Sequence, residues 1–252
     1  MKKPIIMRNM AGVWPAVTRW SGSASLSDLL STEEGTTLVS KDNLNFLFHE
    51  LCDVSSVLVQ DAVKGIMAGD ESESGSKHYT RLYIDKHPEL LPDIDVTTLS
   101  DLASTSIGSV LGTAIPFVPK NMGVWVSSAG CVTPLHYDLC HGFLCQIVGR
   151  KQFLLSSPED TLYLYQNNSI ETKNQTSSKV DLNKWLSKDA EQRKQYPNVD
   201  EAQLFRADLQ PGDVLYTPPG WWHSVTSIDI SVSVLLPFDM TEGEHLSVLQ
   251  SL

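Results

Sequence analysis

The sequence predicts a mainly β fold with helical additions, in which an antiparallel barrel or sandwich occupies roughly residues 120–240. Three observations favour this class. The second half alternates short β-rich runs with turn signals such as Gln210–Asp213 (QPGD) and Pro218–Gly220 (PPG). The first half mixes helical and strand patterns. The chain of 252 residues, 41% of them hydrophobic, is long enough to bury one sizeable core.

In the first half, two segments predict helices and two predict strands. Ser25–Leu30 is typical of a short helix capped by its serine, and Asn43–Cys52 carries apolar residues along one helical face. Ser55–Val59 and Leu82–Ile84 are apolar enough to predict strands. Gly69–Lys77 is acidic, serine-rich and without apolar residues, so we expect a surface loop there.

In the second half, six β-rich runs are separated by turns. The predicted strands are Gly123–Val126, Phe143–Val148, Gln152–Leu155, Val214–Thr217, His223–Val225 and Ile230–Leu236. Asn183–Tyr196 predicts a helical excursion between two strands. The polar stretch Gln166–Lys179 predicts a loop, which we expect beside the site.

The charge balance disfavours one class of partner. Acidic residues outnumber basic ones 30 to 19, which gives a net charge of −11. Proteins that grip the phosphate backbone of nucleic acids normally show the opposite balance, so we expect no such binding. On net charge alone, a basic segment of a protein or peptide is the favoured substrate.

The sequence predicts an intracellular protein, cytoplasmic or nuclear. Residues 1–10 lack the apolar stretch of a signal peptide. Leu102–Pro119 is uncharged, but its serines, threonines, glycines and two prolines exclude a membrane span. The four cysteines match no zinc pattern and are too few for a disulfide scaffold, so we expect reduced core residues. The oligomeric state stays open.

Two separated segments suggest a metal centre. His136 and Asp138 stand two residues apart in Thr133–Asp138 (TPLHYD), so on a strand they would share one face. His223 ends the later segment PPGWWH and could add a second imidazole. Two histidines and one carboxylate form the facial triad of non-haem Fe(II) oxygenases, which leaves coordination positions open.

The histidine–acid spacing is weak evidence on its own. Chance predicts about one such pair in a chain with this many acids. His87-Pro-Glu89 is a decoy of this kind, because its proline argues against a central strand. His141 shares a face with neither His136 nor Asp138, so we leave it out of the triad.

The context of the motif is more specific. Thr133–Lys151 (TPLHYDLCHGFLCQIVGRK) resembles the JmjC-type branch of the cupin superfamily, the Fe(II)- and 2-oxoglutarate-dependent oxygenases, and looks most like its asparaginyl and arginyl protein hydroxylases. Leu209–His223 (LQPGDVLYTPPGWWH) is similar to the family's strand, turn and distal histidine. The resemblance is strong over roughly residues 120–238 and thinner before, where Arg81-Leu-Tyr83 looks familiar. It implies one JmjC/cupin-like domain over 1–252 with a double-stranded β-helix core.

The resemblance also assigns roles to individual residues. It makes His136, Asp138 and His223 the iron ligands, with Lys151, Thr133 and Tyr83 binding 2-oxoglutarate and with Trp125, Gly142 and Ser233 along the substrate or cosubstrate pocket. A buried lysine needs an anionic partner, which agrees with the role of Lys151. The competing interpretation makes each of these a structural residue: core histidines, a surface lysine, a strand threonine or a core tyrosine.

Three positions depart from the family pattern. The hydroxylases usually carry asparagine where this chain has Gly142, and polar or aromatic residues where it has Leu235 and Pro237. The metal ligands are unaffected by these changes. The departures bear on how 2-oxoglutarate and the substrate are contacted.

The resemblance implies a dioxygenase that uses Fe(II), 2-oxoglutarate and O₂ to hydroxylate an amino-acid side chain of a protein or peptide. Three alternatives stay open. The same iron centre could oxidise a small metabolite, or the chain could be a lysine demethylase. The fold could also serve as a non-catalytic cupin binding module, against which the complete triad and Lys151 argue.

Overall fold

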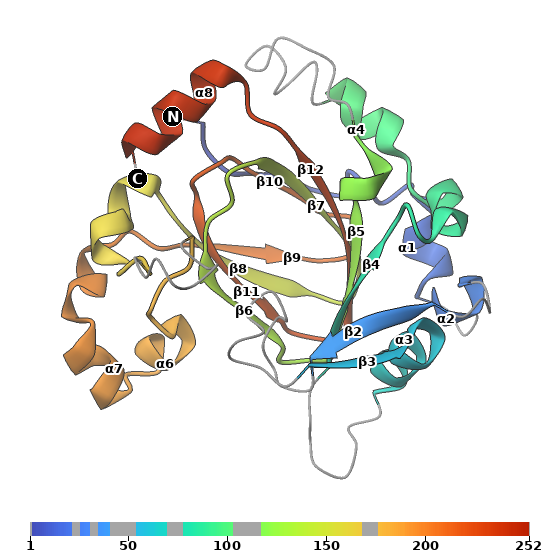
Figure 1. The fold of residues 1–252 in the computed structure, drawn as a ribbon, viewed down its shortest axis with the longest axis horizontal. Coiled ribbons are helices and arrows are strands. Elements are labelled where there is room, and N and C mark those ends of the chain that lie inside the picture. Colours follow the sequence, from blue (N-terminus) through green and yellow to red (C-terminus); the bar gives the residue numbers. More distant parts are fainter. Residues whose placement is uncertain are drawn as a thin grey trace.

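The computed structural model describes residues 2–21, 26–30, 35–40, 54–69, 78–102, 117–167 and 176–251. Two antiparallel sheets face each other across a central space (Figure 1). The larger sheet has the strand order β1-β10-β7-β12-β5-β4-β2-β3, and the smaller has the order β6-β11-β8-β9. This is the predicted mainly β architecture with a jelly-roll core, so the predicted fold class is confirmed.

The strands are short, as the turn signals predicted. Their bounds are β1 Ile5–Met7, β2 Thr36–Ser40, β3 Val54–Leu58, β4 Tyr79–Tyr83, β5 Gly123–Ser127, β6 Val132–His136, β7 His141–Val148, β8 Lys151–Ser156, β9 Phe205–Leu209, β10 Val214–Thr217, β11 Trp222–Ser227 and β12 Ser231–Phe238. All six strands predicted in the second half are present. The structure also contains β6 and β9, and β9 was not predicted.

Helices cover the outside of both sheets (Figure 1). The α-helices are α1 Pro15–Arg19, α2 Leu26–Leu29, α3 Val59–Ala68, α4 Val96–Leu102, α6 Leu182–Leu186, α7 Ala190–Gln195 and α8 Glu242–Ser251. The 3-10 helices are η2 Pro88–Asp93, η4 Pro119–Asn121, η5 Pro158–Tyr163 and η6 Pro197–Glu201. Among the described residues, no helix combines the length and apolarity that crossing a membrane requires.

Several sequence expectations fall partly or wholly on residues that the structure does not describe. The helix expected over Asn43–Cys52 and the cap at Ser25 lie outside the described residues, as do residues 70–77 and 168–175 of the two expected loops. The helical excursion expected over Asn183–Tyr196 is present as α6 and α7.

The alternation of side chains along each strand separates the core from the site. On β12, Val232, Val234 and Leu236 point outward and pack under the N-terminal helices. The alternating residues Leu235 and Pro237 line the space between the sheets. Successive strand residues face opposite sides of a sheet, so a single strand builds both layers.

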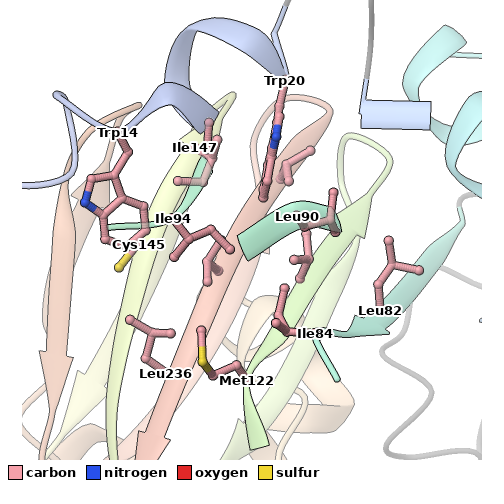
Figure 2. Packing of buried hydrophobic residues seen from close by; sticks show 14 of the residues in the cluster. Trp14, Trp20, Leu82, Ile84, Leu90, Ile94, Met122, Cys145, Ile147 and Leu236 are labelled. Atoms are coloured by element: carbon pink, nitrogen blue, oxygen red, sulfur yellow. The ribbon is translucent and has the colours of Figure 1, made fainter. Parts of the chain in front are cut away.

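The outer layer is a continuous apolar cluster that supports the larger sheet (Figure 2). Trp14 and Trp20 are fully buried there, and Figure 2 shows both in one cluster with residues such as Ile94 and Ile147. The indole Nε1–H of Trp20 donates to Asp93 (2.8 Å), whose other oxygen accepts from Arg19. This packing holds the larger sheet as a rigid wall of the site.

The turn between β7 and β8 requires glycine. Gly149 has a φ of 67°, and a β-carbon on it would collide with the carbonyl oxygen of Ile230. Only glycine adopts this left-handed conformation without strain at such a close approach. The turn delivers the chain to β8, whose first residue is Lys151.

A β-bulge in β6 aims two side chains at the same space. His136 pairs with His223 and Thr133 pairs with Val225, so β6 carries one more residue than β11 between these two pairs. On a regular strand, residues three apart would face opposite sides. The extra residue reverses the alternation of side chains between the two faces of the strand. Thr133 and His136 therefore both line the cavity between the sheets.

Candidate metal and cosubstrate site

The predicted triad comes together at the edge of the cavity. His136, Asp138 and His223 place one ligand atom each within 4.8 Å of one another. Nε2 of His223 lies 3.7 Å from Oδ2 of Asp138, and the two imidazole centroids are 4.2 Å apart. β6 ends at His136, so Asp138 stands just beyond the strand instead of on it as predicted, and its side chain is half exposed.

Backbone carbonyls orient both imidazoles. Nδ1 of His136 lies 2.7 Å from the carbonyl oxygen of Pro134, and Nδ1 of His223 lies 3.0 Å from that of Trp221. An N–H donated to a carbonyl fixes the tautomer in which Nε2 carries the lone pair. Nε2 of each histidine is therefore the nitrogen that could bind a metal.

The site favours neutral imidazole. Burial, followed by the neighbouring His136, holds the pKa of His223 well below its usual value, while Asp138 opposes the shift. A metal ligand must be deprotonated, so the environment keeps His223 ready to bind at neutral pH.

A buried cation lies in the same cavity. The cavity measures about 280 Å³, and its lining includes the triad and Lys151. Lys151 is 1% exposed, and burial lowers the pKa of its ammonium from 10.5 to about 8. Among the described residues Lys151 forms no ion pair, so the charged form lacks the anion that would offset its desolvation.

The tyrosine whose ring lies near Lys151 in the cavity is Tyr79, whereas the sequence analysis named Tyr83. Tyr79 is buried, lines the cavity and is hydrogen-bonded to Thr133 through their hydroxyls at 3.4 Å. Nζ of Lys151 lies 5.8 Å from the Tyr79 ring centroid. Tyr83 is 36% exposed and lies outside the cavity lining, although it is on the same face of β4. The tyrosine that lines the cavity is thus Tyr79, four residues earlier on the same strand than Tyr83.

The predicted pocket residues divide into two groups. Trp125 and Gly142 line the cavity together with Leu235. Ser233 is fully buried and outside the lining, because its hydroxyl donates to Oε1 of Gln146 (2.9 Å). A β-carbon on Gly142 would meet Leu235 at an ordinary 3.6 Å, so the departure from the family pattern opens space without being required by the backbone.

The other histidines considered stand apart from the triad. Nδ1 of His141 lies 2.9 Å from the Tyr216 hydroxyl, and its ring stacks on Phe238. His87 lies 3.4 Å from Glu89 at the start of η2. Within the described residues, the triad is the single group of three or more potential ligands that could hold a metal ion.

Sequence reasoning missed several residues of the cavity wall. The structure adds Tyr79, Arg81, Cys140, Leu144, Phe153, Thr217 and Val225. Burial, with contributions from Asp138 and Asp239, raises the pKa of the Cys140 thiol to about 12, so it is neutral. Tyr79, Arg81 and Tyr83 stand two residues apart in the sequence, which on a strand places them on one face. This spacing was the signal from which Tyr79 and Arg81 could have been found.

The donor set fits a divalent iron and a dicarboxylate. Two imidazole nitrogens and one carboxylate suit Fe(II) and leave positions open for further ligands. The buried ammonium of Lys151, which forms no ion pair within the described part of the chain, fits a carboxylate that reaches into the cavity. The Tyr79 and Thr133 hydroxyls also belong to the lining and could add hydrogen bonds.

The fold and this site define the class of protein. The chain belongs to the family of cupin-like domains, which it matches over residues 1–244. Its relatives are JmjC proteins, a group of hydroxylases and demethylases that generally use Fe(II) and 2-oxoglutarate.

Among its relatives, the chain is 30% identical to lysine-specific demethylase 8 of Danio rerio, over 92% of this chain and 52% of that protein. It is 28% identical to Jumonji C domain-containing protein 5 of Drosophila melanogaster, over 92% of this chain and 53% of that protein. The chain thus spans about half the length of these two relatives. It is 26% identical to the human bifunctional peptidase and (3S)-lysyl hydroxylase JMJD7, over 99% of this chain and 81% of that protein.

Solved structures show the same fold. The X-ray structure of E. coli ycfD superposes with a TM-score of 0.51 at 15% identity, covering 99% of this chain and 54% of that one.

Proposed function

We propose that the chain is an Fe(II)- and 2-oxoglutarate-dependent dioxygenase that hydroxylates an amino-acid side chain of a protein or peptide. One observation carries the proposal: the His136–Asp138–His223 triad and the buried cation Lys151 line one cavity of about 280 Å³. A metal site without an anion site, or the reverse, would fit a simpler binding module.

In this proposal His136, Asp138 and His223 hold the iron through two nitrogens and one oxygen. Lys151, with the hydroxyls of Thr133 and Tyr79, holds the far carboxylate of 2-oxoglutarate. When bound, iron and 2-oxoglutarate supply the oxidation of a C–H bond by O₂, with succinate and CO₂ as coproducts. The protein positions the cosubstrate and keeps bulk water from the inner end of the cavity.

The size of the cavity supports insertion of one side chain. About 280 Å³ is at the lower end of small-molecule sites, and 2-oxoglutarate would take a large part of it. The half-exposed carboxylate of Asp138 marks the open side. A polymer substrate would lie outside and reach the metal through a single residue. The name of the human relative, a (3S)-lysyl hydroxylase, supports a side-chain substrate.

The proposal includes an intracellular location. Cys131, Cys140 and Cys145 form no disulfide within the described residues, as expected in a reducing compartment. With a net charge of −11, we propose no partner that is bound through a nucleic-acid backbone.

The test incubates the full chain with Fe(II), 2-oxoglutarate, O₂ and pools of synthetic peptides. Succinate formation and the gain of one oxygen atom by a peptide are measured together. We expect both with the wild-type chain and neither with His136→Ala, whereas Lys64→Met on the exposed face of α3 should behave as wild type.

Other outcomes would favour the alternatives. Loss of a methyl group from a methylated peptide would indicate a demethylase. Succinate formation driven only by a small-molecule fraction would indicate a metabolite oxygenase. Succinate formation that survives His136→Ala would contradict the proposed centre.

A further inference from the structure

We infer that Arg81 anchors an oxyanion of the substrate, a carboxylate or a phosphate, beside the metal site. The inference rests on the proposed function and names the substrate class: an acidic segment of a peptide, or a small acid. It runs opposite to the basic substrate that net charge alone favours.

Arg81 is built into the wall of the cavity. It lies on β4, opposite Trp125 of β5, and lines the cavity that contains the triad and Lys151. The guanidinium lies 4.9 Å from the Trp125 ring centroid and 4.5 Å from that of Tyr83, so it sits between two aromatic rings. Aromatic faces of this kind hold a guanidinium while leaving its N–H edge available.

A glycine makes room for this side chain. Gly123 pairs with Tyr83 on β4, and a β-carbon on it would lie 2.5 Å from Nε of Arg81. A larger residue at this position would require the Arg81 side chain to shift. The glycine therefore leaves room for the observed position of Arg81 against Trp125.

Arg81 differs from every other arginine of the chain. The five others, Arg8, Arg19, Arg150, Arg193 and Arg206, each form an ion pair with an aspartate. Arg81 forms none within the described residues, although acidic residues outnumber basic ones in this chain.

The hydrogen-bond donors of Arg81 are also largely unused. Among the described residues, buried Nε has no acceptor, and Nη2 donates only a long bond to the carbonyl oxygen of Asn121 (3.3 Å). Buried polar groups without partners are rare, and each one needs an explanation. A ligand that brings an oxyanion would provide both the missing charge and the missing acceptor.

The charges of the loaded site point the same way. A divalent iron and Lys151 would be balanced by Asp138 and by the two carboxylates of 2-oxoglutarate. The positive charge of Arg81 would then be left without a counter-charge on the cavity wall. A cationic substrate would meet repulsion here, whereas a planar carboxylate or a phosphate matches the guanidinium fork.

The test compares matched probes that differ in charge. Three pools of peptides with random sequences are used, and each pool is enriched in one residue: aspartate, asparagine or lysine. The small-acid arm uses N-acetyl-aspartate amide and N-acetyl-phosphoserine amide, with N-acetyl-asparagine amide as the neutral control. Equilibrium binding of labelled peptide pools is measured without iron, and oxidation is measured with iron and 2-oxoglutarate. The peptide and small-acid arms distinguish the two sources of the oxyanion.

Four variants isolate the guanidinium. Arg81→Gln removes the charge, Arg81→Lys keeps the charge without the fork, and Arg81→Glu reverses it. Gly123→Ala displaces Arg81 without removing it. Arg206→Gln is the control, because this arginine is exposed, lies on β9 and is paired with Asp208. Thermal unfolding of each variant checks that the fold is retained.

We expect the wild-type chain to prefer acidic probes. Loss of a charged hydrogen bond lowers kcat/KM and affinity about 10- to 100-fold, so Arg81→Gln and Gly123→Ala should lose the preference by this factor. Arg81→Lys should keep part of it, and Arg81→Glu should favour the lysine pool. The KM for the acidic probe should rise in Arg81→Gln, while the KM for 2-oxoglutarate rises in Lys151→Met.

Equal use of acidic and neutral probes by the wild-type chain would overturn the inference, as would a preference for acids that survives Arg81→Gln. Failure of every probe to bind or react would overturn it too. Absence of succinate formation by the wild-type chain would instead contradict the proposed function, and the iron-free binding arm would still decide the role of Arg81.

Discussion

Lys151→Met is expected to stabilise the protein while weakening cosubstrate binding. Burial lowers the pKa of Lys151 from 10.5 to about 8. At 1.36 kcal/mol per pKa unit, this costs the charged folded state about 3 kcal/mol at neutral pH. Methionine has a similar length and no charge. Because Nζ borders a cavity that water can enter, we expect a gain of about 1–3 kcal/mol in the free energy of unfolding.

The stability difference between wild type and Lys151→Met should depend on pH. Between pH about 8 and 10.5 the unfolded chain keeps a proton on Lys151 that the folded chain has lost. Wild-type stability therefore rises with pH in this window relative to the variant. The advantage of Lys151→Met should be complete at neutral pH and disappear as pH approaches 10.5.

Urea denaturation of both proteins, followed by circular dichroism over this pH range, measures the difference. Lys64→Met, an exposed lysine on α3, is the control and should change stability by less than about 0.5 kcal/mol. With the metal already saturating, adding 2-oxoglutarate at about 100 times its wild-type dissociation constant should stabilise the wild type by about 2.7 kcal/mol more and Lys151→Met by much less. A variant that is less stable at neutral pH, or a difference independent of pH, would refute the reasoning.

Two further predictions compare residues that look alike in the sequence. Tyr79→Phe should raise the KM for 2-oxoglutarate about tenfold, because it removes a hydroxyl beside Lys151, while Tyr83→Phe should change it less than about twofold; equal effects in steady-state kinetics would contradict the placement. Gly149→Ala should lower the free energy of unfolding by at least about 2 kcal/mol, because of its positive φ and the carbonyl behind it. Gly142→Ala should be neutral or stabilising by up to about 1 kcal/mol; a comparable loss at both glycines in chemical denaturation would show that the backbone at Gly149 is not the cause.

The sequence was most informative where one local rule decides the structure. The β-rich runs between proline and glycine turns became strands, because alternation and turn chemistry act over a few residues. The candidate ligands His136 and Asp138 were recognisable from the segment Thr133–Lys151 around them, since their spacing alone is weak evidence. His223 was recognisable from its segment, although pairing with a distant strand brings it to the site.

Tertiary geometry decided what the sequence could not. Tyr79 and Tyr83 lie on one face of β4, but the first is buried and lines the cavity, whereas the second is 36% exposed and lies outside the lining. Thr133 faces the cavity together with His136 because of a bulge that no periodicity predicts. The position of Arg81 depends on Gly123, which is distant in the sequence and adjacent in the sheet.

The central claim is that one cavity holds both a metal and 2-oxoglutarate. An anaerobic titration with Fe(II) and 2-oxoglutarate tests it most directly, through the weak visible charge-transfer absorption of iron chelated by a 2-oxo acid. We predict that the absorption appears in the wild-type chain, is absent in His136→Ala and requires far more 2-oxoglutarate in Lys151→Met. Absence of the absorption in the wild type, or its persistence in His136→Ala, would contradict the account.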